Sequence, residues 1–344
     1  MERATLLNAF SPRPNSSTST NGGIDESAAF LYGCADIMSM PHATLSDSEL
    51  MSRLGVDKKT LGMFKRVRTA AIAEAKLMDS AHSSRKKIKV LGISGSARDE
   101  DDTAAENSNS EELLKICLAN CKKRGADTEL IQLRKYDIRH CKACYSTTNT
   151  QCHFYCSCYP RGQSGDDMTN ILYDKLLGAD MIIFATPVNN FKISTLMAAF
   201  IDRCISMDGS LKPANPKMPK DKELNKKQME YIKLTAEQDV PGSGLLRRFL
   251  GKVAGIIVTG HEEGATMVIT NLFMTLNHFG MTFPPFSNMY AMSNVCRSTH
   301  DDKQIVLSDC YKSETDLLAE NVMNAAKMLR KSKPTSWVYD YTEN

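Results

Sequence analysis

The segment Gly92-Ile93-Ser94-Gly95-Ser96-Ala97-Arg98 follows an apolar run at residues 88–91 and precedes a stretch of helical character that starts near Asn109. A strand that ends in a turn rich in glycine and serine and then leads into a helix directs backbone N–H groups, hydroxyls and the helix dipole toward one point. Such a turn predicts a pocket for a terminal phosphate. Because the G-x-G-x-x-G spacing of dinucleotide sites and the lysine of the Walker pattern are both missing, the turn favours the phosphate of flavin mononucleotide, FMN, over NAD or ATP.

Strand-like and helix-like segments alternate through the rest of the chain. Apolar runs predict strands at 88–94, 128–133, 181–185 and 252–259 and the start of a last strand at 281–283, whereas periodic segments predict helices at 110–124, 166–177, 193–205, 265–279 and 313–330. This alternation favours a parallel sheet with helices on both faces. We therefore expect a doubly wound, flavodoxin-like α/β domain over residues 87–333, with five strands in the order 2-1-3-4-5. Its ligand should lie beyond the carboxyl ends of the strands, between the first and the third.

Regions outside this pattern have a different character. Residues 1–26, rich in Ser, Asn, Pro and Gly, predict a disordered tail, and residues 27–86 predict a helical extension and linker. An insertion at 207–249 contains many lysines, and we interpret it as a solvated surface excursion, with a lid or a subunit contact as the alternative. Residues 334–344 are expected to form a C-terminal tail.

Composition narrows the class of partner. The chain of 344 residues has a formal net charge of only +3 and 42% hydrophobic residues, which argues against nucleic acid as a partner and in favour of small molecules. No run approaches the roughly 20 apolar residues that span a bilayer, so we expect no membrane association. The N-terminus shows no secretory pattern, so we expect a cytoplasmic protein with reduced cysteines.

Five of the eleven cysteines crowd into the loop at residues 140–165: Cys141, Cys144, Cys152, Cys156 and Cys158. Closely spaced thiolates are the ligands of iron–sulfur clusters and of zinc. Free thiols, or a redox-active pair near the flavin, are the other interpretation that the residues leave open.

Further motifs follow the phosphate turn in a fixed order: Asn107-Ser-Asn-Ser110, Asp166-Asp167-Met168, Ala179-Asp180 leading to Thr186-Pro187-Val188, Phe200-Ile-Asp-Arg203, and Thr259-Gly-His-Glu-Glu-Gly264. In order and spacing, over residues 88–290, the series resembles the NAD(P)H-dependent FMN reductases, a family that includes the iron–sulfur flavoproteins and related flavodoxin-like quinone reductases.

The resemblance implies a set of cofactor-binding residues. The FMN phosphate would be held by Ser94, Ser96, Arg98, Asn109 and Ser110, and the flavin ring would run along Thr186, Pro187, Val188, Asn189, Asn190 and Phe191. Thr259, Gly260, His261 and Gly264 would approach the ring from the other side, with His261 and Glu262 as candidates for proton transfer. Asn189 stands where many relatives have an aromatic residue. We expect the acidic insert at 99–106 to face solvent, and Asp202 with Arg203 to make a structural ion pair.

The resemblance also implies an activity. We expect an FMN-dependent oxidoreductase that takes hydride from NADH or NADPH and passes electrons to a small acceptor, such as a quinone, a flavin, or an azo or nitro compound. One alternative is an iron–sulfur flavoprotein with a 4Fe–4S cluster in the 141–158 loop, where Thr147 replaces the family's third cysteine and Cys152, Cys156 or Cys158 would substitute. Another is a flavin redox sensor or electron carrier without enzymatic activity. Family members form oligomers, so a homodimer or homotetramer is expected.

Overall fold

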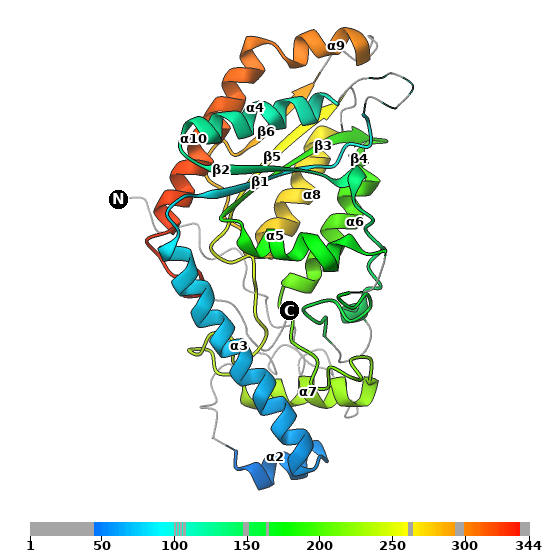
Figure 1. Ribbon diagram of the computed structural model, residues 1–344, viewed down its shortest axis with the longest axis vertical. Helices are drawn as coiled ribbons and strands as arrows, with labels where there is room; N and C mark the ends of the chain where they lie inside the picture. Colours follow the sequence, from blue (N-terminus) through cyan, green and yellow to red (C-terminus); the bar gives the residue numbers. More distant parts are fainter. Residues whose placement is uncertain are drawn as a thin grey trace, which may run out of the picture. The chain divides into compact units, whose positions relative to one another are not determined.

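Five parallel strands form the central sheet of the computed structural model, which describes residues 45–99, 101, 103, 105, 108–146, 151–162, 165–260, 264–292 and 299–337 (Figure 1). The strands lie in the order β2-β1-β3-β5-β6, with bounds β1 Lys89–Ser94, β2 Asp127–Gln132, β3 Met181–Asn189, β5 Val253–Gly260 and β6 Asn288–Met292. All four pairings along this path are parallel. The predicted α/β class is therefore confirmed.

Helices cover both faces of the sheet (Figure 1). On one face, α4 (Asn109–Lys123) and α10 (Asp309–Leu329) bury apolar side chains against strand residues such as Val90 and Ile183. On the other, α5 (Tyr173–Gly178), α6 (Thr195–Cys204) and α8 (Ala265–His278) pack on strand residues such as Ile93 and Phe184. The remaining short elements are α9 (Thr299–Val306), the π-helical turn η3 (Met168–Leu172), and the 3₁₀ turns η1 (Leu133–Lys135), η2 (Cys144–Ser146), η4 (Ile205–Met207) and η5 (Pro334–Ser336).

The sheet differs from the prediction at two ends. β3 continues to Asn189 and pairs with an additional two-residue antiparallel strand, β4 (Lys192–Ile193). The last strand lies at 288–292 and not at 281–283, where Thr282 makes only an isolated bridge with Val253. The two prolines at 284–285 lack the N–H groups that a continuing ladder needs, so regular pairing resumes only after them.

The extension and the insertion share a third hydrophobic core. It joins α2 (Asp47–Leu54) and α3 (Lys58–Ser84) to α7 (Lys222–Thr235), with the rings of Phe64 and Tyr231 5.5 Å apart. The interpretation of the lysine-rich segment as a solvated excursion is therefore wrong. Helix α7 carries lysines together with the buried residues Gln228, Met229, Tyr231 and Ile232, and the Asp221 carboxylate caps the helix by accepting a hydrogen bond from the Leu224 amide.

The first residues of the predicted C-terminal tail, 334–337, include two that contact the rest of the chain. Pro334 is buried, and the Thr335 hydroxyl donates to the Asp79 carboxylate of α3 at 2.7 Å. The predicted tail at 1–26 lies outside the described residues. Among the helices of the described part of the chain, none has the length and apolar character needed to cross a membrane.

Candidate functional site

Three chain segments meet where β1, β3 and β5 end. The Gly95 amide donates to the Ala185 carbonyl at 2.8 Å, and the Ser194 hydroxyl, which caps α6, donates to the Gly95 carbonyl at 2.6 Å. The turn after β1 is thereby fixed between β3 and the start of α6. This is the switch point between the first and third strands at which open α/β sheets bind ligands.

The β3–β4 hairpin forms one wall of the site. Its two turn residues, Asn190 and Phe191, have φ of 50° and 62°, the pattern of a tight two-residue hairpin in which both central residues are left-handed. Asn tolerates this region, but a bulky residue there costs about 1–3 kcal/mol. Phe191 is nevertheless left 58% exposed, so its strained backbone presents an aromatic ring to solvent.

A cavity of ≈ 360 Å³ adjoins this hairpin. The residues that line it come from the hairpin and the start of α6: Val188, Asn189, Asn190, Lys192, Ile193 and Thr195. Two glycines allow the segment after β5 to lie close to the hairpin. A Cβ on Gly260 would lie 2.9 Å from the Cβ of Val188, and a Cβ on Gly264 would lie 2.6 Å from the Cα of Phe191.

Serine hydroxyls gather at the N-terminus of α4. Ser96 is buried and its Oγ accepts a hydrogen bond from the Arg98 amide at 3.2 Å. The Ser108 and Ser110 hydroxyls lie 2.8 Å apart, and within the described residues Ser108 makes no side-chain capping bond to the first turn. Hydroxyls and the amides of a helix start are donors that suit a phosphate dianion, so Ser96, Ser108 and Ser110 fit the FMN phosphate.

A buried carboxylate lies beneath this turn. Glu111, in the first turn of α4, accepts hydrogen bonds from Ser94 Oγ at 2.9 Å, from Gln132 Nε2 at 2.6 Å and from Arg134. Burial acts to raise the pKa of Glu111, but these donors outweigh it and lower the pKa to about 2. The Ser94 hydroxyl already donates its hydrogen bond to Glu111. Ser94 therefore supports the turn through this contact.

The acidic insert at 99–106 was predicted to face solvent, and this prediction is wrong for Asp99. Asp99 Oδ2 lies 3.4 Å from Arg134 Nε, so this residue joins the Glu111 network. Asp101 is exposed, as expected. The insert's remaining acidic residues lie outside the described part of the chain.

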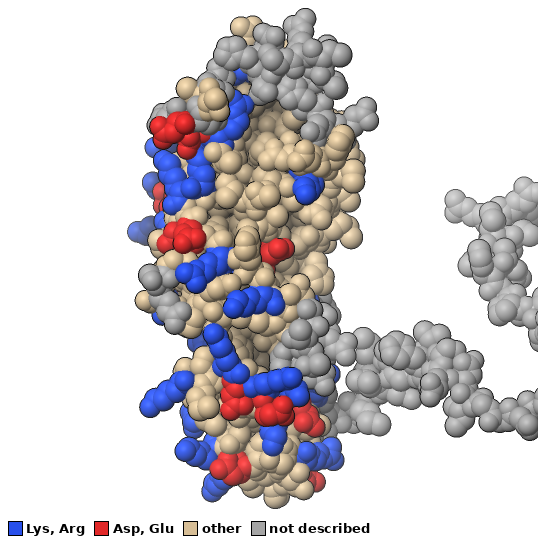
Figure 2. All heavy atoms as spheres, turned by 90° about the vertical axis from the view of Figure 1, so that its right-hand side faces the viewer, with Lys and Arg blue, Asp and Glu red and all other residues tan. Residues whose placement is uncertain are grey.

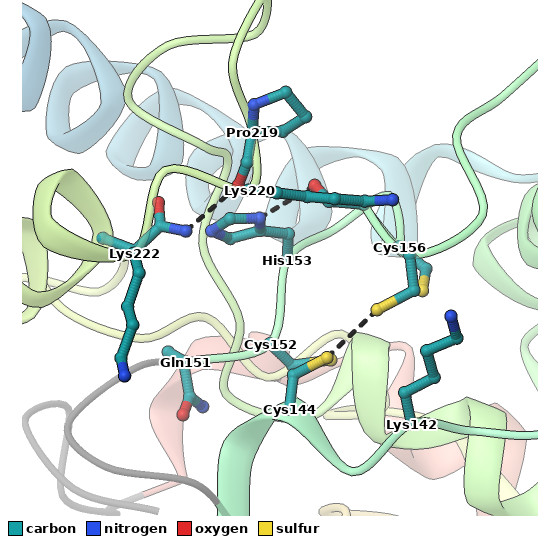
Figure 3. Close-up of a pocket in the computed structure, with 12 residues that line it drawn as sticks. Lys142, Cys144, Gln151, Cys152, His153, Cys156, Pro219, Lys220 and Lys222 are labelled. Carbon is teal, nitrogen blue, oxygen red and sulfur yellow. Dashed lines mark hydrogen bonds between the residues drawn. The ribbon is translucent and has the colours of Figure 1, made fainter.

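A second cavity, of ≈ 280 Å³, lies between the cysteine loop and residues 219–225 of the insertion (Figure 3). Four of the five cysteines line it, namely Cys144, Cys152, Cys156 and Cys158, whereas Cys141 is absent from this lining and accepts a hydrogen bond from the Ala143 amide. Arg203 contacts both ends of the loop. Its guanidinium lies 2.6 Å from the Asp166 carboxylate and donates a hydrogen bond to the Arg139 carbonyl. The predicted ion pair between Asp202 and Arg203 is therefore wrong, because Arg203 pairs with Asp166 and Asp202 is exposed.

The thiols of this cavity divide into distinct environments. Cys144 Sγ and Cys158 Sγ lie 3.0 Å apart. The hydrogen bond from Cys158 lowers the pKa of Cys144 to about 6, and a hydrogen bond from Cys158 together with the charge of Arg203 lowers the pKa of Cys156 to about 6 against the effect of burial. Donation to these two sulfurs raises the pKa of Cys158, and burial raises the pKa of Cys152 to about 12.

The described thiols are not arranged around a metal ion in this structure. Two thiolates on one tetrahedral metal with bonds of about 2.3 Å lie about 3.7 Å apart, which exceeds the 3.0 Å between Cys144 and Cys158. Among the described residues no group of three or more His, Cys, Asp or Glu side chains is arranged to hold a metal ion.

Comparison with known proteins decides the family. The sequence model described as NADPH-dependent FMN reductase matches residues 88–294. The chain belongs to this family. Curated relatives include an iron–sulfur flavoprotein of Methanosarcina thermophila, 30% identical over 118 residues (34% of this chain and 53% of the relative), and one of Archaeoglobus fulgidus, 28% identical over 116 residues (34% and 48%). The chain thus spans about half the length of the curated relatives that it matches.

A solved structure of similar fold is that of RosB with its bound intermediate 8-demethyl-8-formylriboflavin-5′-phosphate. It aligns with a TM-score of 0.50 at 17% identity, over 72% of this chain and 81% of that one. At this identity the likeness concerns the fold alone, and it agrees with the flavodoxin-like strand order of this FMN reductase family member.

The predicted residues of this family member are only partly brought together. The structure places Val188, Asn189 and Asn190 around one cavity and packs Gly260 and Gly264 against the same hairpin. Asn107, His261 and Glu262 lie outside the described residues. The phosphate turn and the hairpin come from elements that adjoin in the sheet, as predicted.

Sequence reasoning missed four residues of this site. Lys192 and Thr195 line the cavity, Ser108 pairs with Ser110, and Glu111 supports the turn. Ser108 carried a signal, since a serine just before a helical run is a typical N-cap. Lys192 carried none, because only the unpredicted β4 brings it to the cavity.

Proposed function

We propose that this protein is an FMN-dependent oxidoreductase that takes hydride from NADH or NADPH and passes electrons to a small acceptor. The single observation that carries this proposal is the cavity at the end of β3, lined by the β3–β4 hairpin and the start of α6, in a sheet where β3 lies between β1 and β5. When bound, FMN supplies the hydride and electron chemistry, and the protein supplies binding and orientation.

The phosphate end is assigned to the turn after β1. Ser96, Ser108 and Ser110 would offer hydroxyls, Arg98 its guanidinium and the first turn of α4 its amides. The helix dipole stabilises negative charge at this position. The negative charge of Glu111 does not face a phosphate bound at the turn, because its carboxylate accepts hydrogen bonds from Ser94, Gln132 and Arg134.

The ring end is assigned to the hairpin cavity. The side-chain amides of Asn189 and Asn190 would meet the polar edge of the ring, and Phe191 would offer apolar contact. Lys192 brings a positive charge to the same wall and so favours an anionic ligand. Gly264 lets the β5 end approach the hairpin, which keeps the wall narrow.

The proposal extends to assembly as a homodimer or homotetramer. Helix α8 contains no Asp, Glu, Lys or Arg over residues 265–278, and it leaves Met267 and Met274 67% and 63% exposed. Uncharged helix faces of this kind are typical of subunit contacts. Native mass spectrometry of the full chain tests this point, and a monomer at micromolar concentration would contradict it.

The name of the relatives raises a second function, electron transfer through an iron–sulfur cluster. The thiol arrangement of this chain does not fit one, so no electron path is assigned through the cysteine loop.

Anaerobic mixing of FMN-loaded protein with NADH and, separately, NADPH tests the proposed activity. Bleaching of the flavin absorbance at a saturable rate, followed by recovery on adding a quinone, is expected. Protein that binds FMN but is not reduced by either nicotinamide would leave binding intact and contradict the reductase activity.

A further inference from the structure

The cavity in the cysteine loop combines thiols with positive charge. Three lysines, Lys142, Lys220 and Lys222, belong to its lining, and all three are exposed. In the close-up, the ammonium ends of Lys142 and Lys220 lie on the side of the cavity where Cys156 is labelled (Figure 3). None of the described lining residues is acidic, so the cavity favours an anionic ligand.

The polar groups of the cavity are otherwise neutral. His153 is buried, which lowers its pKa to about 4, and its Nδ1 lies 2.8 Å from the Ser157 hydroxyl. Gln151 and Asn225 contribute amides, of which Asn225 donates to the Pro219 carbonyl at 3.0 Å. The residues at 219–225, which include Lys220 and Lys222, belong to the insertion. Figure 2 shows Lys and Arg side chains interspersed with Asp and Glu on the lower part of this face. The insertion therefore supplies charge to a cavity whose sulfur atoms come from the cysteine loop.

Two of the thiols are placed for bond formation. Cys144 Sγ and Cys158 Sγ are 3.0 Å apart and both residues are half-buried. An S–S bond of about 2.05 Å requires an approach of only about 1 Å. The other two lining cysteines, Cys152 and Cys156, are more deeply buried, so Cys144 and Cys158 are the more exposed pair of the cavity.

We propose that Cys144 and Cys158 form a dithiol–disulfide couple that reduces a small, negatively charged disulfide bound in this cavity. Cys144 thiolate attacks one sulfur of the ligand disulfide, forming a mixed disulfide and expelling the first ligand thiolate. Cys158 then loses its proton and attacks Cys144 Sγ, which forms the Cys144–Cys158 bond and expels the second ligand thiolate. Two electrons pass from the two cysteines to the ligand, and two ligand thiols leave.

The electrostatics support this division of roles. Positive charge beside a thiol favours the thiolate that attacks a disulfide, and Cys144 lines the cavity together with Lys142 and Lys220. The reaction is independent of FMN, so its failure would leave the proposed flavin chemistry untouched.

Single-turnover reaction of the full, reduced chain with two probe disulfides tests the proposal. The probes are the dianion of dithiobis(nitrobenzoic acid) and the uncharged dithiodipyridine, both of which release coloured thiols. The wild type should release two probe thiols in a fast phase, and peptide mass analysis should find Cys144 joined to Cys158. The Cys158→Ser variant should stop at a stable mixed disulfide on Cys144, and Cys144→Ser should lose the fast phase.

Controls separate chemistry from folding. Cys310, exposed on α10, is the matched control, and Cys310→Ser should retain the fast phase. The double variant Lys142→Gln/Lys220→Gln keeps all thiols, and it should react roughly tenfold more slowly with the anionic probe and at an unchanged rate with the uncharged one. A fast phase that survives in Cys144→Ser, or a wild type that stops at the mixed disulfide, would overturn the proposal. So would iron or zinc bound to the anaerobically purified chain and lost in Cys144→Ser.

Discussion

Gly264 lies against the backbone of Phe191 so closely that a β-carbon on the glycine would fall 2.6 Å from the phenylalanine Cα. The two residues belong to loops that follow different strands, β5 and β3. Their contact fixes the distance between the two walls proposed to enclose the flavin ring. The strained, left-handed conformation of Phe191 persists because its neighbours hold it.

Gly264→Ala should raise the Kd for FMN at least tenfold, since the added methyl group must displace the 190–191 turn. Titration of apoprotein with FMN, followed by flavin fluorescence, measures the effect. Gly178→Ala is the matched control, because a Cβ there meets nothing within 4 Å. Equal affinities for the two variants would show that the hairpin does not contact the cofactor.

Phe191→Gly should stabilise the protein and weaken cofactor binding. Glycine adopts a φ of 62° without the side-chain penalty, so the free energy of unfolding of the apoprotein should rise by about 1 kcal/mol. Loss of the exposed ring should raise the Kd for FMN. Chemical denaturation and FMN titration give the two quantities, and a loss of stability would contradict the strain assigned to Phe191.

Arg98→Ala should weaken FMN binding at least tenfold, about 1.4 kcal/mol, because it removes the guanidinium assigned to the phosphate. Riboflavin, which lacks the phosphate, should bind wild type and variant equally. If Arg98→Ala changes riboflavin and FMN binding by the same factor, the phosphate lies elsewhere.

Glu111 should make the protein acid-sensitive. Its pKa of about 2 lies below its ordinary value of 4.5, so the buried carboxylate contributes stability above pH 4.5 that is lost as the pH falls toward 2. The shift corresponds to about 3 kcal/mol over that whole range. Urea unfolding of wild type and Glu111→Gln at pH 5, 4 and 3 should show a flatter pH dependence in the variant. Parallel curves would mean that another group titrates.

The sequence predicted the strand order, and with it the sheet edge of the candidate site, better than the local structure there. Alternating strands and helices determine where β1, β3 and β5 end, so the serine turn and the 186–191 segment could be placed at one edge of the sheet. The hairpin could not be predicted, because Phe191 in a left-handed turn has no glycine signal and β4 has only two residues.

Long-range packing explains the other differences. The buried residues Met229, Tyr231 and Ile232 lie among lysines, so helix α7 was not recognised without its partners on α2 and α3. The contact of Cys144 with Cys158 depends on how the loop folds back on itself, and spacing along the chain does not fix such a pairing.

The visible absorption spectrum of anaerobically purified protein, with the released cofactor identified and iron determined on the same sample, tests FMN binding most directly. Flavin bands from one FMN per chain, without stoichiometric iron, are the predicted result. Colourless protein that also fails to bind added FMN would contradict the assignment of the hairpin cavity to the flavin ring.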